Sequence, residues 1–365
     1  MQLAQQRSVL RQVGTQNRQH GSRVVAPQRP AARTTRLTVA NTAAPEISTQ
    51  LSSSSTDLDE VRQSLAARLA SSDVVMQPIS IPGVPDDYHP SQGWRPLPHH
   101  LSKQEIWQRI RQEAKADADA EPTLASFLYS SILGHSSFEK SLNFILANKL
   151  ASPTLYSTQL VKIIEDCFKE EPSIVEAALA DMQACFDRDP ACDKYTQCLL
   201  YFKGFQAIQC HRIAHHLWGK GRKMLAVALQ SRISEAFHVD IHPAATFGRG
   251  ILLDHATGVV VGETAVVGDN VSMLHHVTLG GSGTGKGIRH PTIGHGVLLG
   301  AGVSVLGNVT VGCGAKVGAG SVVVSDLPCH SVAVGVPARI VKQGSRSEPC
   351  QTMDQIEDFI LDYVI

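Results

Sequence analysis

The sequence has few features of a membrane protein, a secreted protein or a nucleic-acid-binding protein. None of its apolar stretches approaches the roughly 18 residues that a membrane-spanning helix needs, and no secretory signal is recognisable. The eight cysteines include no CxxC pair, so neither a zinc knuckle nor a disulfide framework is indicated. The formal net charge is zero, and no basic stripe follows the first 56 residues to attract a nucleic acid. These absences favour a reducing compartment and argue against nucleic-acid and membrane partners.

The N-terminal segment differs in composition from the rest of the chain. Residues 1–56 hold seven Arg, one Glu and no Lys, and they are rich in Ser, Thr, Gln and Ala. This composition is typical of an organellar transit peptide, and an ordinary disordered N-terminus is the competing interpretation. Residues 57–100 end in the Pro-rich run ISIPGVPDDYHPSQGWRPLPHH, which predicts a linker.

A helical pattern follows the linker. Ser102 stands three residues before Glu105, and Ser136 three before Glu139, as in capping boxes at the start of helices. Apolar residues then recur at spacings of three and four, including in the long segment YTQCLLYFKGFQAIQCHRIAHHLW, for which we expect continuous helix. Residues 101–237 are therefore predicted to form an all-helical domain.

The period changes to six near residue 240. Thirteen aliphatic or aromatic positions carry the repeat: Ile241, Phe247, Leu253, Val261, Val267, Met273, Leu279, Ile293, Leu299, Val305, Val311, Val317 and Val323. Such hexads predict a parallel β-helix, in which each hexad is one short strand and a corner, and glycine permits tight corners. We assign residues 238–341 to this domain and residues 342–365 to a C-terminal tail, so the fold class is α+β.

Two interruptions of the repeat are candidate functional positions. The phase slips by two residues beside Asp254 and His255, and the insert GGSGTGKGIRHPT carries Lys286, Arg289 and His290. A regular coil needs neither, and loops on a rigid scaffold supply both polar groups and room for a ligand. The alternative is that the slip only corrects the register and that His255 bonds a carbonyl.

The motifs on both sides of these interruptions resemble one family. The segments DRDPACDKY, VDIHPAA, GRGILLDHATGVVVGETAVVGDNV and GVPARIV are similar to those of serine O-acetyltransferase, in its organellar plant or algal type, and the likeness runs from about residue 102 to the last residue. It implies a left-handed β-helix, a homotrimer or a dimer of trimers, and chloroplast localisation, with the mitochondrion as the alternative. It also implies acetyl transfer from acetyl-CoA, as co-substrate and without a metal, to L-serine, the step that commits serine to cysteine synthesis.

The resemblance assigns the catalytic base to His255. A serine hydroxyl is a poor nucleophile, and an imidazole has a suitable pKa to take its proton during attack on a thioester. Asp240 matches the family's carboxylate partner, which would hold the second imidazole nitrogen and stabilise the imidazolium.

Serine is a small zwitterion, and the resemblance supplies opposite charges for its two ends. Asp189 and Asp254 match the residues that hold the ammonium group, while Arg289 and His290 match those that hold the carboxylate. The chain departs from the family at Ile288, where an Asp is usual. We therefore expect altered hydrogen bonding around Arg289.

Small residues and the chain end complete the implied sites. Gly281, Ala301 and Ala319, together with Lys316, match the family's CoA-binding positions, although the fold itself requires small residues at corners. The terminal Ile365 matches the residue that enters the active site of O-acetylserine sulfhydrylase, the partner enzyme.

Several other interpretations of the sequence remain open. His211 and His215 have a spacing that can bind zinc, although packed helix histidines are the more common case. The tandem His275 and His276 resemble those of β-helical zinc carbonic anhydrases, and a further alternative is another hexapeptide acyltransferase. A non-catalytic scaffold would tolerate loss of His255. Cys313 is a possible acylated nucleophile, but it has no adjacent base in VGCGAK.

Overall fold

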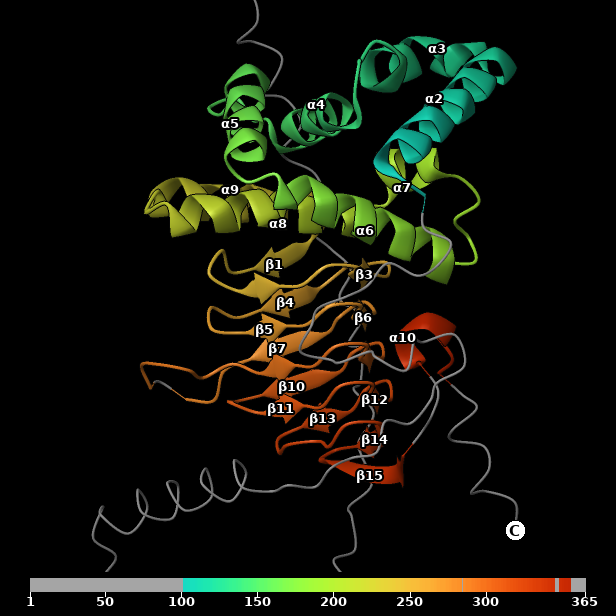
Figure 1. The fold of residues 1–365 in the computed structure, drawn as a ribbon. Helices are drawn as coiled ribbons and strands as arrows, with labels where there is room; N and C mark the ends of the chain where they lie inside the picture. The colour runs from blue at the N-terminus through green and yellow to red at the C-terminus, as the bar shows by residue number, and fades with distance from the viewer. Residues whose placement is uncertain (1–100, 284, 345–347, 356–365) are drawn as a thin grey trace, which may run out of the picture. The chain divides into compact units, whose positions relative to one another are not determined.

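The computed structural model describes residues 101–283, 285–344 and 348–355 (Figure 1). The predicted transit peptide, the predicted linker and Ile365 lie outside these residues. Within the described part of the chain, none of the helices is long and apolar enough to cross a membrane.

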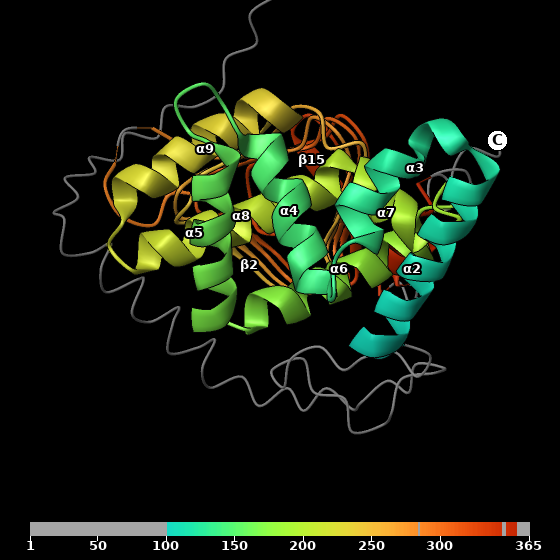
Figure 2. The same ribbon diagram turned by 90° about the horizontal axis from the view of Figure 1, so that it is seen from above.

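The predicted all-helical domain is confirmed, and its helices are seen from above in Figure 2. They are α2 (Lys103–Ala120), α3 (Pro122–Leu128), the π-helical turn η2 (Tyr129–Leu133), α4 (Phe138–Leu150), α5 (Ser157–Glu170), α6 (Ser173–Arg188), α7 (Tyr195–Tyr201), α8 (Lys203–Gly219) and α9 (Lys223–Phe237).

Two details of the predicted helices need correction. The capping box of Ser102 and Glu105 is present, but the later cap is Ser137, whose side chain accepts from the Lys140 N–H, and not Ser136. The long predicted helix is two helices, because Phe202 adopts an extended conformation between α7 and α8. Its backbone N–H still bonds the Cys198 carbonyl, so α7 ends there and α8 leaves in a new direction.

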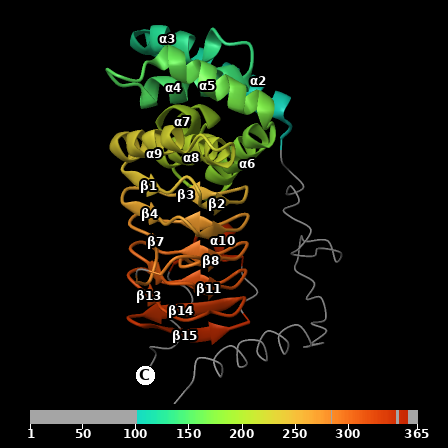
Figure 3. The same cartoon turned by 90° about the vertical axis from the view of Figure 1, so that its left-hand side faces the viewer.

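The second domain is a stack of coils made of three sheets, parallel except for the last strand (Figure 3). Sheet 1 contains β1 (Val239–Ile241), β4 (Val259–Val261), β7 (Thr278–Gly280), β10 (Ser304–Leu306) and β13 (Val322–Val323). Sheet 2 contains β2 (Thr246–Phe247), β5 (Val266–Val267), β8 (Thr292–Ile293) and β11 (Thr310–Val311). Sheet 3 contains β3 (Leu252–Leu253), β6 (Ser272–Met273), β9 (Leu298–Leu299), β12 (Lys316–Val317), β14 (Ser331–Gly335) and β15 (Ala338–Gln343).

The six-residue repeat marks the core of these coils. Every predicted position lies on a strand, and all are buried except Phe247, which is half-buried beside the His211 ring of α8 at 5.1 Å. The predicted parallel β-helix is therefore confirmed. The repeat does not predict the last strand, since β15 runs antiparallel to β14 and ends the stack as a hairpin.

Three columns of corners join the sheets. The histidine corner lies between sheets 3 and 1, at residues 254–258, 274–277, 300–303 and 318–321. The arginine corner lies between sheets 1 and 2, at residues 242–245, 262–265, 281–283, 285–291 and 307–309. The cysteine corner lies between sheets 2 and 3, at residues 248–251, 268–271, 294–297, 312–315 and 328–330. Side chains in one column come from successive coils and therefore stack.

The helices dock on the first coil through a buried ion pair. Asp181 of α6 is fully buried and accepts three hydrogen bonds from the Arg212 guanidinium at 2.7, 3.0 and 3.1 Å, as well as one from the Ile251 N–H at 2.8 Å. Arg212 also donates to the Gly248 carbonyl at 2.7 Å. Because losing one partner of such a pair leaves an uncompensated buried charge, this joint fixes the helices against the cysteine corner.

The segment after β15 folds back onto sheet 3. Helix α10 (Pro349–Thr352) lies there, and the Cys350 carbonyl accepts from the Ser272 hydroxyl at 3.0 Å. Asp354 pairs with Lys316 at 3.1 Å. The predicted tail therefore begins as part of the folded domain.

Candidate functional site

The phase slip forms a distinctive turn at the histidine corner. Leu253 and Val261 are eight residues apart where the repeat requires six, and His255 and Ala256 both adopt left-handed backbone conformations with φ of 54° and 56°. Left-handed non-glycine residues are uncommon and cluster at functional sites. As a result the His255 side chain projects outward and is 73% exposed. This geometry argues against the alternative in which His255 bonds a carbonyl.

The helical domain supports this turn from outside. Gly204, near the start of α8, sits so close to the end of β3 that an added Cβ would lie 2.0 Å from the Leu253 carbonyl oxygen. The Lys203 ammonium donates to the Thr257 hydroxyl in the same turn. A glycine at this position is therefore required for the helix to approach the slip.

Two carboxylates lie at the same corner as His255. Asp254 Oδ1 is 3.8 Å from His255 Nε2, which is ion-pair range but longer than a hydrogen bond. Burial raises the pKa of Asp254, the neighbouring Asp189 carboxylate raises it further, and His255 and His275 oppose the shift. Asp189 ends α6, and its side chain accepts from the Ala191 N–H at 2.9 Å. Two acids side by side, one with a raised pKa, favour the binding of a cation.

A column of small residues continues below the histidines. Backbone N–H groups of successive coils donate to the carbonyls of Thr257, His275 and Ala301, at 2.8, 2.9 and 2.7 Å. These bonds place Ala319 in the same column, one coil further on. The His275 ring meets the His255 ring edge-on at 5.9 Å, and its buried Nδ1 has no hydrogen-bond partner among the described residues. Since Ala301 and Ala319 add almost no side chain, a ligand could lie along this corner close to the backbone.

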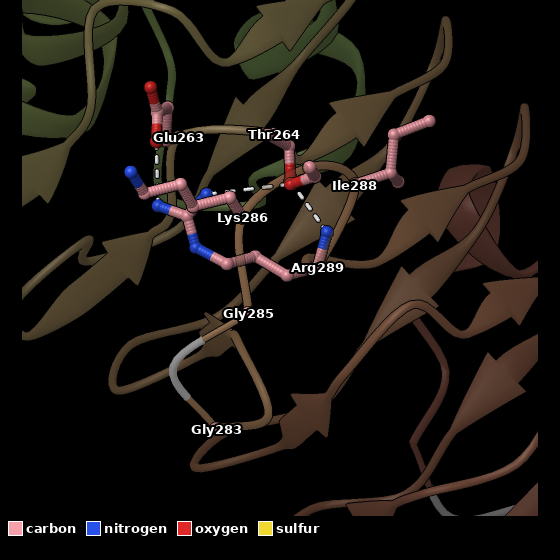
Figure 4. Close-up of a pocket in the computed structure, with 8 residues that line it drawn as sticks. Glu263, Thr264, Gly283, Gly285, Lys286, Ile288 and Arg289 are labelled. Atoms are coloured by element: carbon pink, nitrogen blue, oxygen red, sulfur yellow. Dashed lines mark hydrogen bonds and ion pairs between the residues drawn. The ribbon is translucent and has the colours of Figure 1, made fainter.

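The arginine corner gathers the other predicted charges. Arg289 donates to Glu263 Oε2 at 2.6 Å, while its backbone N–H donates to the Thr264 hydroxyl at 3.0 Å. This hydrogen bond with Arg289 lowers the pKa of Glu263 and keeps its carboxylate ionised. Figure 4 shows both contacts at the edge of an open pocket of about 630 Å³, which Lys286 and Ile288 also line.

His290 is oriented by the same threonine. The Thr264 backbone N–H donates to His290 Nδ1 at 3.2 Å, so the neutral ring carries its hydrogen on Nε2. Burial and the neighbouring Arg289 charge lower the pKa of His290, which favours that neutral form. The Nε2 edge faces Gly262 and Gly281, and a Cβ on Gly262 would lie only 1.9 Å from it. These two glycines therefore make room for a ring that can donate one hydrogen bond.

Within one chain the two corners are separate. They flank the short strands of sheet 1, so corner residues such as Thr257 and Gly262 on either side of β4 are five positions, or about 15 Å, apart at roughly 3 to 3.3 Å per residue. Asp240 lies between them on the outer face of β1, where its Oδ1 accepts from the Gln230 side chain at 2.7 Å. The structure thus brings together Asp189, Asp254 and His255, and separately Arg289 and His290, whereas the pairing of Asp240 with His255 stays a prediction.

The predicted CoA-contact positions are divided in the same way. Ala301 and Ala319 share the histidine corner, while Gly281 lies at the arginine corner against His290. Lys316 lies on sheet 3, where its side chain is 4% exposed and pairs with Asp354. The structure therefore does not place Lys316 in the column with the two alanines.

The other histidines considered from the sequence have structural contacts. His211 Nε2 contacts the Ala245 carbonyl at 3.1 Å, and His215 Nδ1 contacts the Pro243 carbonyl at 2.8 Å, so both join α8 to the first coil. Over residues 101–283, 285–344 and 348–355, no group of three or more His, Cys, Asp or Glu side chains is placed to hold a metal ion.

Sequence reasoning missed the residues that orient Arg289 and His290. Glu263 and Thr264 stand 26 and 25 residues before Arg289 in the chain but one coil away in space. Their signal was the polar pair ET inside VVVGETAVV, at a corner where the repeat otherwise favours small residues.

The fold and the site together define a class. A parallel β-helix of hexads, with an exposed histidine at an interrupted coil, agrees with the hexapeptide-repeat acyltransferase architecture that the sequence predicts.

Comparison with known proteins identifies the family within this class. Residues 106–210 match the family described as "Serine acetyltransferase, N-terminal". Serine acetyltransferase 4 of Arabidopsis thaliana is 54% identical over 249 residues, covering 68% of this chain and 70% of that protein. A solved serine acetyltransferase in complex with cysteine is 51% identical, with a TM-score of 0.69, and covers 70% of this chain and 99% of the other. Soybean serine acetyltransferase complexed with serine is 59% identical, with a TM-score of 0.65 and coverage of 66% and 98%. The chain belongs to the serine acetyltransferase family.

Family membership decides between the remaining alternatives. It makes the protein an acyltransferase, and it favours acetyl transfer to serine over carbonic anhydrase chemistry, another acyl acceptor or a scaffold role. The roles of individual residues rest on the geometry described above.

Proposed function

We propose that this chain transfers the acetyl group of acetyl-CoA to the hydroxyl of L-serine, giving O-acetylserine and CoA. The observation that carries the proposal is the histidine corner, where an exposed imidazole stands beside two acids and above a column of small residues. The formation of O-acetylserine commits serine to cysteine synthesis.

His255 acts as the general base in this proposal. It takes the proton of the serine hydroxyl while the oxygen attacks the thioester carbonyl, and the imidazolium then returns the proton to the leaving thiolate of CoA. Such catalysis typically contributes about a hundredfold to ten-thousandfold. Asp240 is proposed to hold the imidazolium, and Asp254 is the carboxylate already in ion-pair range of it.

Serine is bound by its two charged ends. Asp189 and Asp254 accept hydrogen bonds from the ammonium group, whose positive charge offsets the burial and the nearby Asp189 carboxylate that raise the pKa of Asp254. Arg289, oriented by Glu263, and the Nε2–H of His290 donate to the carboxylate.

These two sets of residues require a neighbouring subunit. Because one chain keeps its histidine and arginine corners about 15 Å apart, we propose a homotrimer, extended to a dimer of trimers, in which the histidine corner of one subunit faces the arginine corner of the next. The exposed Val260 on sheet 1 and Val266 on sheet 2 are apolar surface for such a contact.

A complementation experiment tests the shared site. His255→Asn and Arg289→Ala each inactivate a homotrimer, but a mixed trimer contains an interface in which both residues are intact. Co-expression of the two variants should restore activity that mixing the purified homotrimers without subunit exchange does not. A mixed assembly that stays inactive would place both residues of a site in one subunit.

Acetyl-CoA is proposed to lie along the histidine corner, with its arm against Ala301 and Ala319. The tight stacking of this column supports the placement, because a side chain there would block approach to the backbone. Gly281 would contact it from the facing arginine corner. Lys316 reaches CoA in this proposal only where Asp354 releases it.

The C-terminal end of the chain is proposed to bind a partner enzyme. We propose that Ile365 and its free carboxylate enter the active site of O-acetylserine sulfhydrylase, since a pocket built for an α-carboxylate can capture a terminal carboxylate. Deletion of residues 362–365 should abolish complex formation and leave acetyl transfer nearly unchanged. Binding that survives the deletion would contradict this role.

Residues 1–56 are proposed to be a transit peptide for the chloroplast, with the mitochondrion as the alternative. A fusion of these residues to a fluorescent protein tests the assignment. Fluorescence in the cytosol would contradict it.

The reaction itself is tested by thiol release. Purified protein is mixed with acetyl-CoA and a panel of hydroxyl compounds, and free CoA is followed spectroscopically. L-serine should be the best acceptor, and hydroxyl compounds without an α-carboxylate should be poor ones. A sugar that outperforms serine would assign the chain to another acceptor class.

A further inference from the structure

The cysteine corner stacks two thiols in adjoining coils. In each coil this corner contains one residue with a left-handed backbone, at Gly250, Asn270, Gly296, Gly314 and His330. The residues immediately before them form one column: Arg249, Asp269, His295, Cys313 and Cys329. Cys313 and Cys329 are therefore equivalent positions of neighbouring coils.

Hydrogen bonds along the column fix this register. The N–H of each left-handed residue donates to the carbonyl one coil earlier: Asn270 to Arg249 at 2.7 Å, Gly296 to Asp269 at 2.9 Å, Gly314 to His295 at 2.8 Å and His330 to Cys313 at 2.8 Å. Val311 and Leu327, two residues before the cysteines, also pair in parallel. Paired strands are about 4.8 Å apart, which lies within the range of about 4.4 to 6.8 Å that Cα atoms show across a disulfide.

The two thiols also meet each other and the solvent. Cys313 and Cys329 are in side-chain contact, Cys313 is half-buried and Cys329 is exposed. Burial raises the pKa of the Cys313 thiol, and the neighbouring Cys329 raises it further. The more accessible Cys329 is thus the thiol that a reagent from solution meets first.

A second pair of thiols offers an internal comparison. Cys185 and Cys198 are also in contact, but both are buried in the helical domain, and burial raises the pKa of Cys198 strongly. Contact between thiols is therefore not sufficient for reaction with a solute. The cysteine corner combines contact with exposure, and the buried pair does not.

We propose that Cys313 and Cys329 form a thiol-modification site at which a small-molecule disulfide, such as oxidised glutathione, produces an intrachain disulfide. The Cys329 thiolate attacks one sulfur of oxidised glutathione, the S–S bond breaks, and one glutathione thiolate leaves. Cys313, after losing its proton to solvent, attacks the Cys329 sulfur of the mixed disulfide and releases the second glutathione. The two protein thiols are oxidised, and one disulfide of glutathione is reduced to two thiols.

The experiment uses the full chain and a glutathione redox buffer. The native protein is incubated with oxidised glutathione, alkylated, digested and analysed by mass spectrometry. We expect the loss of two titratable thiols and a cross-linked pair of peptides that contain Cys313 and Cys329, both reversed by reduced glutathione. Cys313→Ser should stop at a glutathione adduct on Cys329, whereas Cys329→Ser should form neither product.

Two outcomes with the native protein would overturn the proposal. A stable glutathione adduct on the native protein would show that Cys313 cannot resolve it, and unchanged thiols would show that the corner is unreactive. Cys350, whose sulfur would lie 3.7 Å from a Cβ on Gly296, is the nearby control. Cys350→Ser should leave the cross-link unchanged, and a cross-link between Cys313 and Cys350 would contradict the pairing.

Discussion

The histidine corner and the arginine corner belong to the same coils but handle charge in opposite ways. At the arginine corner, Arg289 has a carboxylate partner in Glu263, and Thr264 orients the backbone of the loop. At the histidine corner, the acids Asp189 and Asp254 stand near each other, and the pKa of Asp254 is raised. The charge of Arg289 is therefore balanced within the chain, while the two acids are stabilised when a cation binds. We infer that the insert holds Arg289 already oriented to bind an anion. The slip, by contrast, lies beside two acids that a bound cation would stabilise.

The largest effect is expected where the slip exposes its histidine. His255→Asn should lower kcat by at least about a hundredfold, because it removes the general base. The melting temperature should change little, since the side chain is 73% exposed. Turnover is measured by thiol release, with a thermal melt of the same sample. Near-normal turnover would show that His255 is not the base and that the two corners do not differ in function as proposed.

A smaller effect is expected at the arginine corner. Arg289→Lys should raise the KM for serine by about tenfold or more, because hydrogen bonds to charged groups contribute about 1.5 to 3 kcal/mol and a lysine cannot reproduce the guanidinium fork. The KM for acetyl-CoA should be unchanged. Equal increases in both constants would mean that Arg289 does not recognise the carboxylate of serine.

The two corners should also differ in the sign of their effect on stability. Asp254→Asn should raise the KM for serine but also raise the melting temperature at neutral pH, because the pKa of the folded-state acid is raised and its ionised form costs stability. This gain over the native protein should shrink as the pH falls through the raised pKa and vanish near the ordinary value of 3.8. Glu263→Gln is the control, because its pKa is lowered and its loss should not stabilise the protein. A destabilised Asp254→Asn at pH 7 would argue against a free-energy cost of keeping this partly buried carboxylate ionised.

The smallest effect is expected at the departure from the family pattern. Ile288 is 72% exposed, and Arg289 is already oriented by Glu263. Ile288→Asp should therefore lower the KM for serine by no more than a few-fold, with Ile288→Asn as the uncharged control. A decrease in the KM for serine of more than about tenfold would show that Glu263 alone does not orient Arg289 fully and that a second acid is needed.

The sequence predicted the coils well because their signal is local. Every hexad position except the half-buried Phe247 is buried inside the coil that carries it, and the slip at His255 is visible as a break in phase. Contacts between coils have no periodic signal, only a polar pair, Glu263 and Thr264, at a corner, so the partners of Arg289 were missed although the loop itself was found. The same reason explains Lys316, whose partner Asp354 follows it by 38 residues and covers it from outside. The break at Phe202 was missed because the apolar spacing continues across it.

The stacking of coils gives the histidine corner a fixed unit of length. His275, Ala301 and Ala319 are separated by one coil each, or about 4.8 Å per step. Between Val305 and Val323, one whole coil occupies 18 residues. A change of a single residue would turn inward-facing aliphatic side chains outward, so the corner can be lengthened or shortened only in whole coils. The distance along this edge between the catalytic histidine and any contact can therefore change only in steps of one coil.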